Sequence, residues 1–392
     1  MTSTKTTSNR FDLSRDLFMA FISDIHLAHP RTNTYHIIAN LRKAFPDTDE
    51  TGKLDILFLA GDVFDRLMSL PQDEVDAIQE WIADLLRICV KRNIIVRIVE
   101  GTPSHDWRQS KQFVNVNNTL GTPANLKYVD ALSIEVIKEL GGLSVLYVPD
   151  EWNADASVTK QQVIELLAIH GMDKVDVGCM HGSFDYQLPI ESVKNHDSEF
   201  YLSIVRHFIG IGHVHIRTEK AVPAFPSVIL AQGSFDRLSH GEEAAKGHYR
   251  ACLSKAGNYH WFVENQGARL YKTLDCRAMD IDQVLEILES YENEPNESCF
   301  RLMINRGTAV QHGLKDLRKR FPQFRITTQM DDLKPQEKID LAHVELPKVK
   351  PISITPTNIG HLVSDRLKRH FADEQGHEAQ MVMNVLEKYK DQ

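Results

Sequence analysis

The sequence predicts an α/β protein in which short buried strands alternate with amphipathic helices. Apolar runs such as LFMAFIS before Asp24 and LDILFLA before Gly61 are short and bounded by turns or charges, as buried strands are. The segment that follows the second run carries apolar residues at helical spacing: Val75, Ile78, Ile82, Leu85, Leu86 and Cys89. Strands that alternate with helices imply a layered core in which helices cover a sheet.

The same reading continues to about residue 262. Further strands are expected at IIVRIV, LSVLYV, VDVGCM, HFIGIG and SVILAQ, and a helix is expected near residues 157–169. We therefore assign residues 1–266 to one large α/β domain, which a chain of 392 residues can accommodate beside smaller units.

The pattern changes after about residue 267. A strand-like stretch at Leu270–Leu274 precedes a helix pattern over 281–288, an alternating strand over 300–304, a second helix over 310–321 and a last strand, RITTQM. This order predicts a βαβαβ-like unit, and we expect a separate small α/β domain over residues 267–345.

Residues 346–392 are predicted to form a linker and two short helices. The linker LPKVKPISITP is rich in Pro and Lys, and the helices are marked by apolar residues at helical spacing: Ile359, Leu362, Val363, Leu367, then Val382, Val385, Leu386 and Tyr389. Helices this short are marginal alone. They dock either on their own chain or on a partner, and the sequence leaves both open.

Composition bounds the class of protein. Hydrophobic residues make up 42% and charged residues 25%, and no run reaches the roughly 18 apolar residues of a membrane span. The start, MTSTKTTSNR, lacks the apolar segment of a signal peptide. Five scattered cysteines without CxxC spacing predict a reducing compartment, so we expect a cytoplasmic protein. The net charge of −9 does not exclude nucleic acid, because bound metals and a local basic stripe can attract it.

Acidic and imidazole side chains follow the ends of the predicted strands. Ser23-Asp24-Ile25-His26 follows the first, and two residues spaced by one point to the same side of an extended strand. Asp62 begins Gly61-Asp62-Val63-Phe64-Asp65-Arg66 after the second, and Gly101-Thr102-Pro103-Ser104-His105-Asp106 follows the third. Met180-His181-Gly182 and Gly212-His213-Val214-His215 end two later strands. Such loops are where α/β proteins build their sites, and carboxylates with imidazoles suit a divalent metal.

Each cluster alone is weak evidence, but their joint order resembles the calcineurin-like metallophosphoesterase family, whose blocks are DxH, GDxxD, GNH(D/E), H and GHxH. The resemblance implies a four-layer αββα sandwich and two divalent metals. By position, it assigns the first metal to Asp24, His26 and His215, makes Asp62 the bridge, and gives the second metal to His181 and His213. It makes His105, Asp106 and Asp65 the catalytic residues, with His105 beside the scissile phosphate and Asp106 after it, while Asp65 and Arg66 support the bridging loop.

One block departs from the family pattern. The asparagine that precedes the family's catalytic histidine and ligates the second metal is absent, and Ser104 stands next to His105. Ser104 is therefore the expected replacement ligand, although a hydroxyl is a poorer ligand than an amide oxygen. We expect weaker binding of the second metal, or a water in the missing position.

The resemblance also implies a mechanism. Two cations about 3.5–4 Å apart lower the pKa of a bridging water, and the resulting hydroxide attacks phosphorus while His105 protonates the leaving oxygen. Imidazole and carboxylate ligands without thiolate suit Mn²⁺, Fe or Zn²⁺. The resemblance favours Mn²⁺.

The segment LAQGSFDRLSHGEEAAKGHY, residues 230–249, is similar to the one that closes the phosphoesterase domain in SbcD-type nuclease subunits. That likeness implies a DNA exo/endonuclease subunit that hydrolyses double-stranded DNA, forms a homodimer and works with an SbcC-like coiled-coil ATPase, which the C-terminal helices would bind. Candidates for DNA phosphate contacts are Arg66 and the basic helix face of Lys315, Arg318 and Lys319, and that face is equally a solvated helix face.

Two rival functions remain. The first is a phosphoesterase of the same fold that acts on a small molecule or a protein, for which a small second domain and terminal helices are unnecessary. The second is a scaffold with impaired catalysis, which the missing asparagine favours and the intact Asp and His set opposes.

Overall fold

The computed structural model describes residues 13–68, 72–189 and 192–330. Two six-stranded sheets dominate this part of the chain, and the α/β sandwich predicted from the sequence is confirmed. Among the described residues, no helix has the length and apolar character needed to cross a bilayer. The predicted linker and helices of residues 346–392 lie outside the described residues.

The first sheet has the order β12-β11-β1-β2-β3-β4. Strands β1 to β4 run parallel, whereas β11 pairs antiparallel with β1 and β12 pairs antiparallel with β11. Their bounds are β1 Leu17–Ile22, β2 Ile56–Ala60, β3 Ile95–Val99, β4 Leu126–Val129, β11 Gly247–Leu253 and β12 Tyr259–Glu264.

The second sheet has the order β5-β6-β7-β8-β10-β9. Its four central strands run parallel, and the edge strands β5 and β9 are antiparallel to their neighbours. The bounds are β5 Ser133–Ile137, β6 Leu143–Val148, β7 Val175–His181, β8 Val205–Gly212, β9 Thr218–Ala221 and β10 Val228–Ala231.

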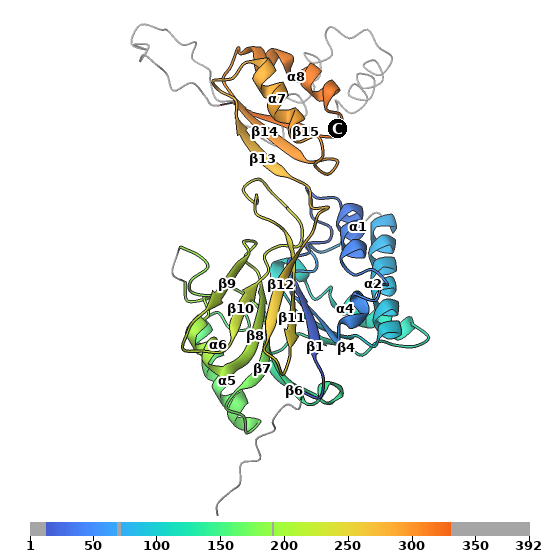
Figure 1. The fold of residues 1–392 in the computed structure, drawn as a ribbon, viewed down its shortest axis with the longest axis vertical. Helices are drawn as coiled ribbons and strands as arrows, with labels where there is room; N and C mark the ends of the chain where they lie inside the picture. The colour runs from blue at the N-terminus through green and yellow to red at the C-terminus, as the bar shows by residue number, and fades with distance from the viewer. Residues whose placement is uncertain (1–12, 69–71, 190–191, 331–392) are drawn as a thin grey trace, which may run out of the picture. The chain divides into compact units, whose positions relative to one another are not determined.

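The sheets pack face to face, and helices cover the outer face of each (Figure 1). Along β1, Met19 and Phe21 enter the core between the sheets, while Ala20 and Ile22 face the helices, as the two-residue period of a strand requires. Phe21 stacks on Phe58 at 5.0 Å between ring centroids. The resulting order of layers is helix, sheet, sheet, helix.

The helical layers come from different parts of the chain. The first sheet is covered by α1 Thr34–Ala44, α2 Gln72–Arg92 and α4 Lys111–Thr119, and the second by α5 Ala156–Ile169 and α6 Ser198–Ile204. Short turns of helix complete this part: η1 Thr51–Lys53, α3 Pro103–Asp106 and η2 Lys138–Leu140.

Residues 271–330 build the predicted βαβαβ unit, a parallel three-stranded sheet of order β13-β14-β15 with two helices. It encloses a buried cluster of its own, which includes Val284, Phe300 and Leu317. Its elements are β13 Tyr271–Asp275, α7 Ile281–Glu289, β14 Cys299–Ile304, α8 Ala309–Arg320 and β15 Arg325–Met330. The described part of this unit and the sandwich both belong to residues 1–332, one compact unit, and the domain boundary at residue 267 stays a prediction.

Candidate metal centre

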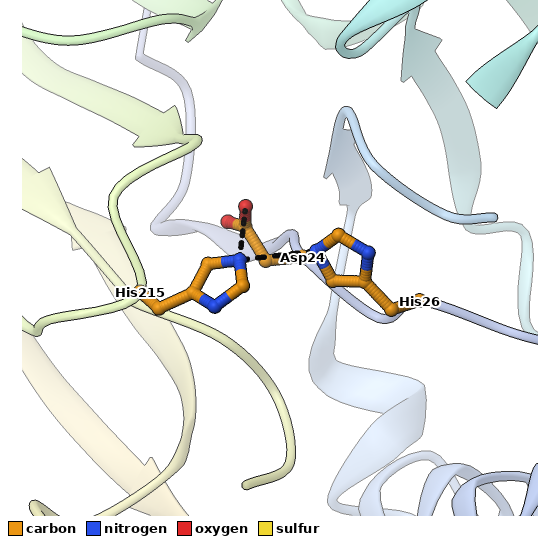
Figure 2. Close-up of side chains that lie close together, drawn as sticks. All are labelled: Asp24, His26 and His215. Atoms are coloured by element: carbon orange, nitrogen blue, oxygen red, sulfur yellow. Dashed lines mark hydrogen bonds and ion pairs between the residues drawn. The ribbon is translucent and has the colours of Figure 1, made fainter. Parts of the chain in front are cut away.

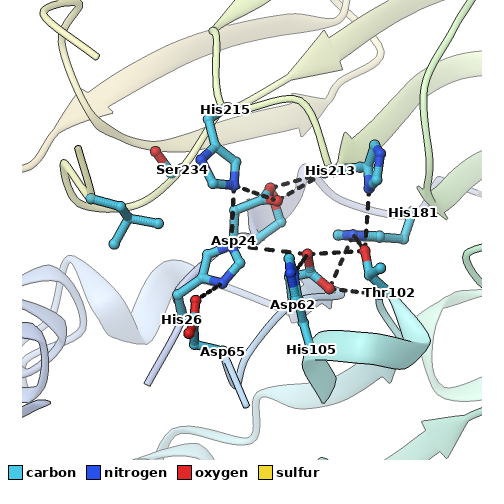
Figure 3. A network of polar contacts seen from close by, with 12 residues as sticks. Asp24, His26, Asp62, Asp65, Thr102, His105, His181, His213, His215 and Ser234 are labelled. Atoms are coloured by element: carbon cyan, nitrogen blue, oxygen red, sulfur yellow. Dashed lines mark hydrogen bonds and ion pairs between the residues drawn. The ribbon is translucent and has the colours of Figure 1, made fainter. Parts of the chain in front are cut away.

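The acidic and imidazole residues predicted from the motifs converge at one place. They form three overlapping groups whose ligand atoms lie within 4.8 Å of one another: Asp24, His26 and His215; His26, Asp62 and His105; Asp62, His181 and His213. They lie in the loops after β1, β2 and β3 of one sheet, and at the end of β7 and in the loop after β8 of the other (Figure 3). The sandwich therefore gathers strand ends from both sheets around one centre.

The backbone brings Asp24 and His26 together in a way that the sequence analysis did not foresee. β1 ends at Ile22, and Asp24 and His26 have φ of +50° and +53°, so they are not two positions of an extended strand. Their loop is held against the loop after β2, because the amides of Ile25 and His26 both donate to the carbonyl of Asp62, at 2.9 and 3.1 Å. The expected convergence is present, but its predicted cause is wrong.

Backbone strain is concentrated at this centre. Asp62 and His213 also have positive φ, +49° and +108°. Non-glycine residues in this region cost on the order of 1–3 kcal/mol each, and such conformations gather at functional sites. Gly61 is needed for a related reason, because at its φ of +81° an added Cβ would lie 2.2 Å from Nδ1 of His181.

The first group brings two imidazole nitrogens close to a carboxylate oxygen. The Nε2 atoms of His26 and His215 lie 3.1 Å apart (Figure 2). Nδ1 of His215 lies 3.3 Å from Glu242, which holds the ring proton there, and Nδ1 of His26 lies 3.1 Å from Asp65 without the geometry of a hydrogen bond. The Nε2 lone pair of His215 then faces Nε2 of His26, with an Asp24 oxygen 3.7 Å from His215. A proton or a metal cation resolves this arrangement.

The group of Asp62, His181 and His213, called the second group from here on, repeats this pattern. Nδ1 of His181 lies 2.6 Å from the carbonyl oxygen of Ala60, and Nε2 lies 3.3 Å from an Asp62 oxygen. His181 and Asp62 are 0% and 1% exposed, so water does not solvate the charge. Burial acts to raise the pKa of Asp62, but the charge of His181 and the hydrogen bond from His105 lower that pKa well below its usual range. The carboxylate is therefore held ionised.

Thr102, rather than the predicted Ser104, supplies the hydroxyl of this group. Thr102 Oγ1 lies 3.1 Å from an Asp62 oxygen, 3.2 Å from Nδ1 of His213 and 3.5 Å from Nε2 of His181. Ser104 is exposed on α3, and its carbonyl accepts a hydrogen bond from the indole of Trp107. The sequence signal for Thr102 was its place directly after Gly101, where the family carries asparagine.

These distances fit a metal ion. Ligand atoms about 2.1 Å from one cation, at angles of about 90–110°, lie about 3.0–3.4 Å from each other. The contacts of Thr102 and the pair of His181 with Asp62 range from 3.1 to 3.5 Å. Imidazole nitrogens with carboxylate oxygens and no thiolate suit a first-row divalent metal. The buried His and Asp groups are thus able to hold a metal ion.

His105 stands at the open side of the centre. Its Nδ1 lies 3.0 Å from an Asp62 oxygen, and its side chain is 40% exposed, in contrast to the buried rings of His26 and His181. The hydrogen bond with Asp62 raises the pKa of His105 above its usual value, against the effect of burial. His105 is therefore accessible to a substrate and inclined to carry a proton.

Asp106 and Asp65 act differently from the catalytic roles predicted for them. Asp106 is fully buried and accepts from the backbone amides of Phe64 and Gly101, both at 2.9 Å, so it ties the loop after β3 to the loop after β2. Burial and the neighbouring carboxylates raise the pKa of Asp106 to about 8. Asp65 faces Nδ1 of His26. Both are positioning residues, because Asp106 is fully buried and Asp65 faces the ring of His26.

A second supporting network lies behind His215. Glu242 faces Nδ1 of His215 with one oxygen and accepts hydrogen bonds from Ser234 and Lys246 with the other, at 3.0 and 2.8 Å. Lys246 also donates to the carbonyl of His215, at 2.9 Å. The segment 230–249 was singled out in the sequence, but the role of Glu242 as the partner of a ligand histidine was not.

The residues predicted to contact DNA lie on the surface. Arg66 is exposed beside Asp65. Lys315, Arg318 and Lys319 are exposed on α8, where Arg318 donates to the carbonyl of Ile326 at 3.0 Å. Lys319 lies 3.8 Å from Asp316 of the same helix. None of them belongs to the three groups formed by the described residues.

Comparison with known proteins adds little. No family model and no curated protein matches the chain. Sixty chains of solved structures match. One of them, from a crystal structure, is 13% identical and covers 64% of this chain and 99% of its own length at a TM-score of 0.39, which is too low to carry an argument.

Proposed function

We propose that this chain is a two-metal phosphodiesterase, the SbcD-like nuclease subunit of a DNA-processing complex, and that it hydrolyses DNA phosphodiesters with Mn²⁺. The observation that carries the proposal is the overlap of the ligand groups. Asp62 belongs to two of them, and His26 also belongs to two. Isolated structural metal sites do not share ligands in this way, whereas a pair of ions used in phosphoryl chemistry does.

The geometry of Asp62 supports two ions. One of its oxygens lies 3.3 Å from His181, and the other lies 3.9 Å from Nε2 of His26. Oδ1 therefore faces His181, while Oδ2 faces His26 and also contacts the Thr102 hydroxyl at 3.1 Å. Asp24, His26 and His215 would hold one ion, and His181 and His213 the other, with Asp62 between them.

The residues divide the work of hydrolysis. Divalent cations bound here would supply Lewis-acid activation of water and of the phosphoryl group. His105, at the open side, donates a proton to the leaving oxygen. Asp65 and Glu242 keep the rings of His26 and His215 turned toward the centre, which is the usual task of carboxylates behind ligand histidines.

The rim of the centre favours nucleic acid over a small phosphoester. Arg66 and Arg108 are exposed next in sequence to Asp65 and Trp107, and the Trp107 indole is 54% exposed two residues from His105. Guanidinium groups contact phosphates, and an exposed indole offers a face on which a base can stack. A site for a small phosphomonoester has no need of this rim.

Partners and compartment are part of the same proposal. An SbcC-like coiled-coil ATPase would bind the C-terminal helices, and the chain would act as a homodimer on double-stranded DNA. All five cysteines are free thiols, which agrees with the reducing cytoplasm.

The direct test compares His105→Ala with His170→Ala, an exposed histidine at the end of α5, in the full chain. Both proteins are incubated with Mn²⁺ and labelled duplex, single-stranded and hairpin DNA, with and without the ATPase, and with bis-p-nitrophenyl phosphate. We expect His105→Ala to lose at least a hundredfold in rate, because proton transfer contributes about 10²–10⁴. Its metal content, measured by mass spectrometry, should equal that of the His170→Ala control.

The outcomes separate the rival functions. Hydrolysis of the generic diester without cleavage of any DNA, even with the ATPase present, would favour a phosphoesterase for other substrates. Absence of stoichiometric metal from the wild-type protein would favour the scaffold. Full activity of His105→Ala would remove this histidine from the mechanism.

A further inference from the structure

A buried carboxylate outside every motif faces the second group of ligands. Asp150 follows β6, and its side chain is 6% exposed. Its Oδ2 has no hydrogen-bond partner among the residues that the structure describes, and it lies 3.6 Å from Nδ1 of His213. Its amide lies 3.4 Å from the carbonyl of Glu100, at the end of β3 in the other sheet. A buried carboxylate oxygen without a partner is costly, so its position calls for a cation.

Among the described residues, no lysine or arginine forms an ion pair with Asp150. Gly182 has φ of +139°, and a Cβ at this position would lie 3.3 Å from Oδ1 of Asp150 and 3.1 Å from Nε2 of His196. His196 is thus close, and its side chain is buried. Lys194, which lines a pocket together with Asp150 and His213, is paired with Glu151.

The second group also lacks the ligand that the family asparagine would provide. Thr102 offers a neutral hydroxyl in its place, which is a weak ligand for a divalent ion. His213 Nδ1 is 3.2 Å from that hydroxyl and 3.6 Å from Asp150. Two ligand atoms about 2.1 Å from one ion are 3.6 Å apart when they subtend an angle of about 120°. Asp150 therefore faces the second group through His213, at a distance that suits two ligands of one ion, although it is not among the residues whose ligand atoms lie within 4.8 Å of one another.

We propose that Asp150 is a carboxylate ligand of the second metal ion and replaces the missing asparagine. The proposal rests on the two-metal centre proposed above and adds a residue to it. Its consequence is a second site with an additional negative charge, because an anionic oxygen takes the place of a neutral amide. Such a site holds a divalent cation more tightly than the Thr102 hydroxyl alone allows.

Metal titration of the full chain tests this assignment without reference to catalysis. Calorimetric titration with Mn²⁺ is compared for the wild type, Asp150→Asn, Asp150→Ala and the control Glu151→Gln. Glu151 is the adjacent carboxylate, 40% exposed, so its replacement removes the same charge from the neighbouring position. Visible absorption of the Co²⁺-loaded proteins reports the ligand number at the ions. Circular dichroism in EDTA verifies that each variant folds, and Asp150→Asn retains the shape of the side chain.

The wild type is expected to bind two ions. Both Asp150 variants should retain one ion at unchanged affinity and bind the other at least tenfold more weakly, with an altered Co²⁺ spectrum, whereas Glu151→Gln should match the wild type. Wild-type affinity for both ions in Asp150→Asn and Asp150→Ala would overturn the assignment. So would an equal loss in Glu151→Gln, since charge alone would then explain it. A wild type that binds one ion or none would instead refute the two-metal centre, a failure that the titration separates from the first.

Discussion

Replacement of Glu242 by glutamine should weaken both the fold and the first metal group. One oxygen of Glu242 faces Nδ1 of His215 at 3.3 Å, and the other accepts from Nζ of Lys246 at 2.8 Å. The Lys246 side chain is 2% exposed, so water cannot replace the carboxylate beside it. Burial accordingly lowers the pKa of its ammonium group. Glu242→Gln keeps the shape and removes the charge that both groups require.

The size of the effect follows from this burial. Removing one partner of a buried ion pair costs about 3–5 kcal/mol, because the other charge stays behind. The Glu242 side chain is 13% exposed, and Lys246 still donates to Ser234 at 2.7 Å, so the lower end, about 3 kcal/mol, is expected. Loss of a carboxylate behind a ligand histidine lowers metal affinity by about 10–100-fold.

Two measurements separate these effects. Urea unfolding in EDTA, followed by circular dichroism, gives the free energy of unfolding without metal, and Mn²⁺ titration gives the affinity. The double variant Glu242→Gln/Lys246→Met should recover most of the stability, because the unpaired ammonium is gone, but not the metal affinity. A single variant that matched the wild type in both measurements would show that this network neither stabilises the fold nor orients His215.

Two predictions concern the sandwich itself. In Gly210→Ala, the new Cβ would lie 2.1 Å from Cδ1 of the buried Phe21, so overpacking should cost about 1–3 kcal/mol in urea unfolding. The control Gly178→Ala, 3.3 Å from a methyl group of Ile209, should cost less, and equal costs would contradict this reasoning. Burial lowers the pKa of His248 from 6.5 to about 3, so its contribution to stability is complete above pH 6.5, falls as the pH falls, and is fully lost near pH 3. Between pH 7 and 5 the free energy of unfolding of the wild type should fall by about 2 kcal/mol more than that of His248→Phe. Parallel pH profiles of the two proteins would show that the pKa of His248 is not lowered in the folded state.

Most of the sandwich strands that the sequence predicted lie in runs that are wholly apolar or, like β3 with its buried Arg97, are broken by a single polar residue. β2 and β3 are buried along their whole length, and their runs were visible without any contact information. β11 is buried just as completely, yet its sequence GHYRACL contains His248 and Arg250. Because a buried histidine and arginine break the apolar pattern, only the pairing with β1 and β12 reveals this strand.

Helix α1 escaped detection for a similar reason. Its buried face includes Asn40, whose side-chain amide donates to Asp236 at 2.8 Å and lies 3.0 Å from Nε2 of His36. A polar residue on the buried face weakens the helical apolar pattern, and its partner is almost 200 positions away in the chain. The sequence contains no local signal for such a contact.

The motifs predicted which residues converge, but counting along the chain misassigned one of them. Counting back from His105 selected Ser104, the immediate neighbour in sequence. Pro103 to Asp106 instead form one turn of helix, which exposes Ser104 and returns His105 to within 3.0 Å of Asp62. Thr102, before the turn, keeps the place beside Gly101. Two extra residues are therefore absorbed as a helical turn without displacing the histidine.

The backbone of Asp24, His26 and Asp62 explains why convergence was predictable and its geometry was not. The motif fixes residue types and order, whereas positive φ at three ligand positions arises from contact between the loops after β1 and β2. Each strained residue costs on the order of 1–3 kcal/mol, and such conformations occur mainly at functional sites. Bound cations would offset that cost by neutralising the carboxylates, and the strain is thus an argument for a metal centre that is independent of any motif.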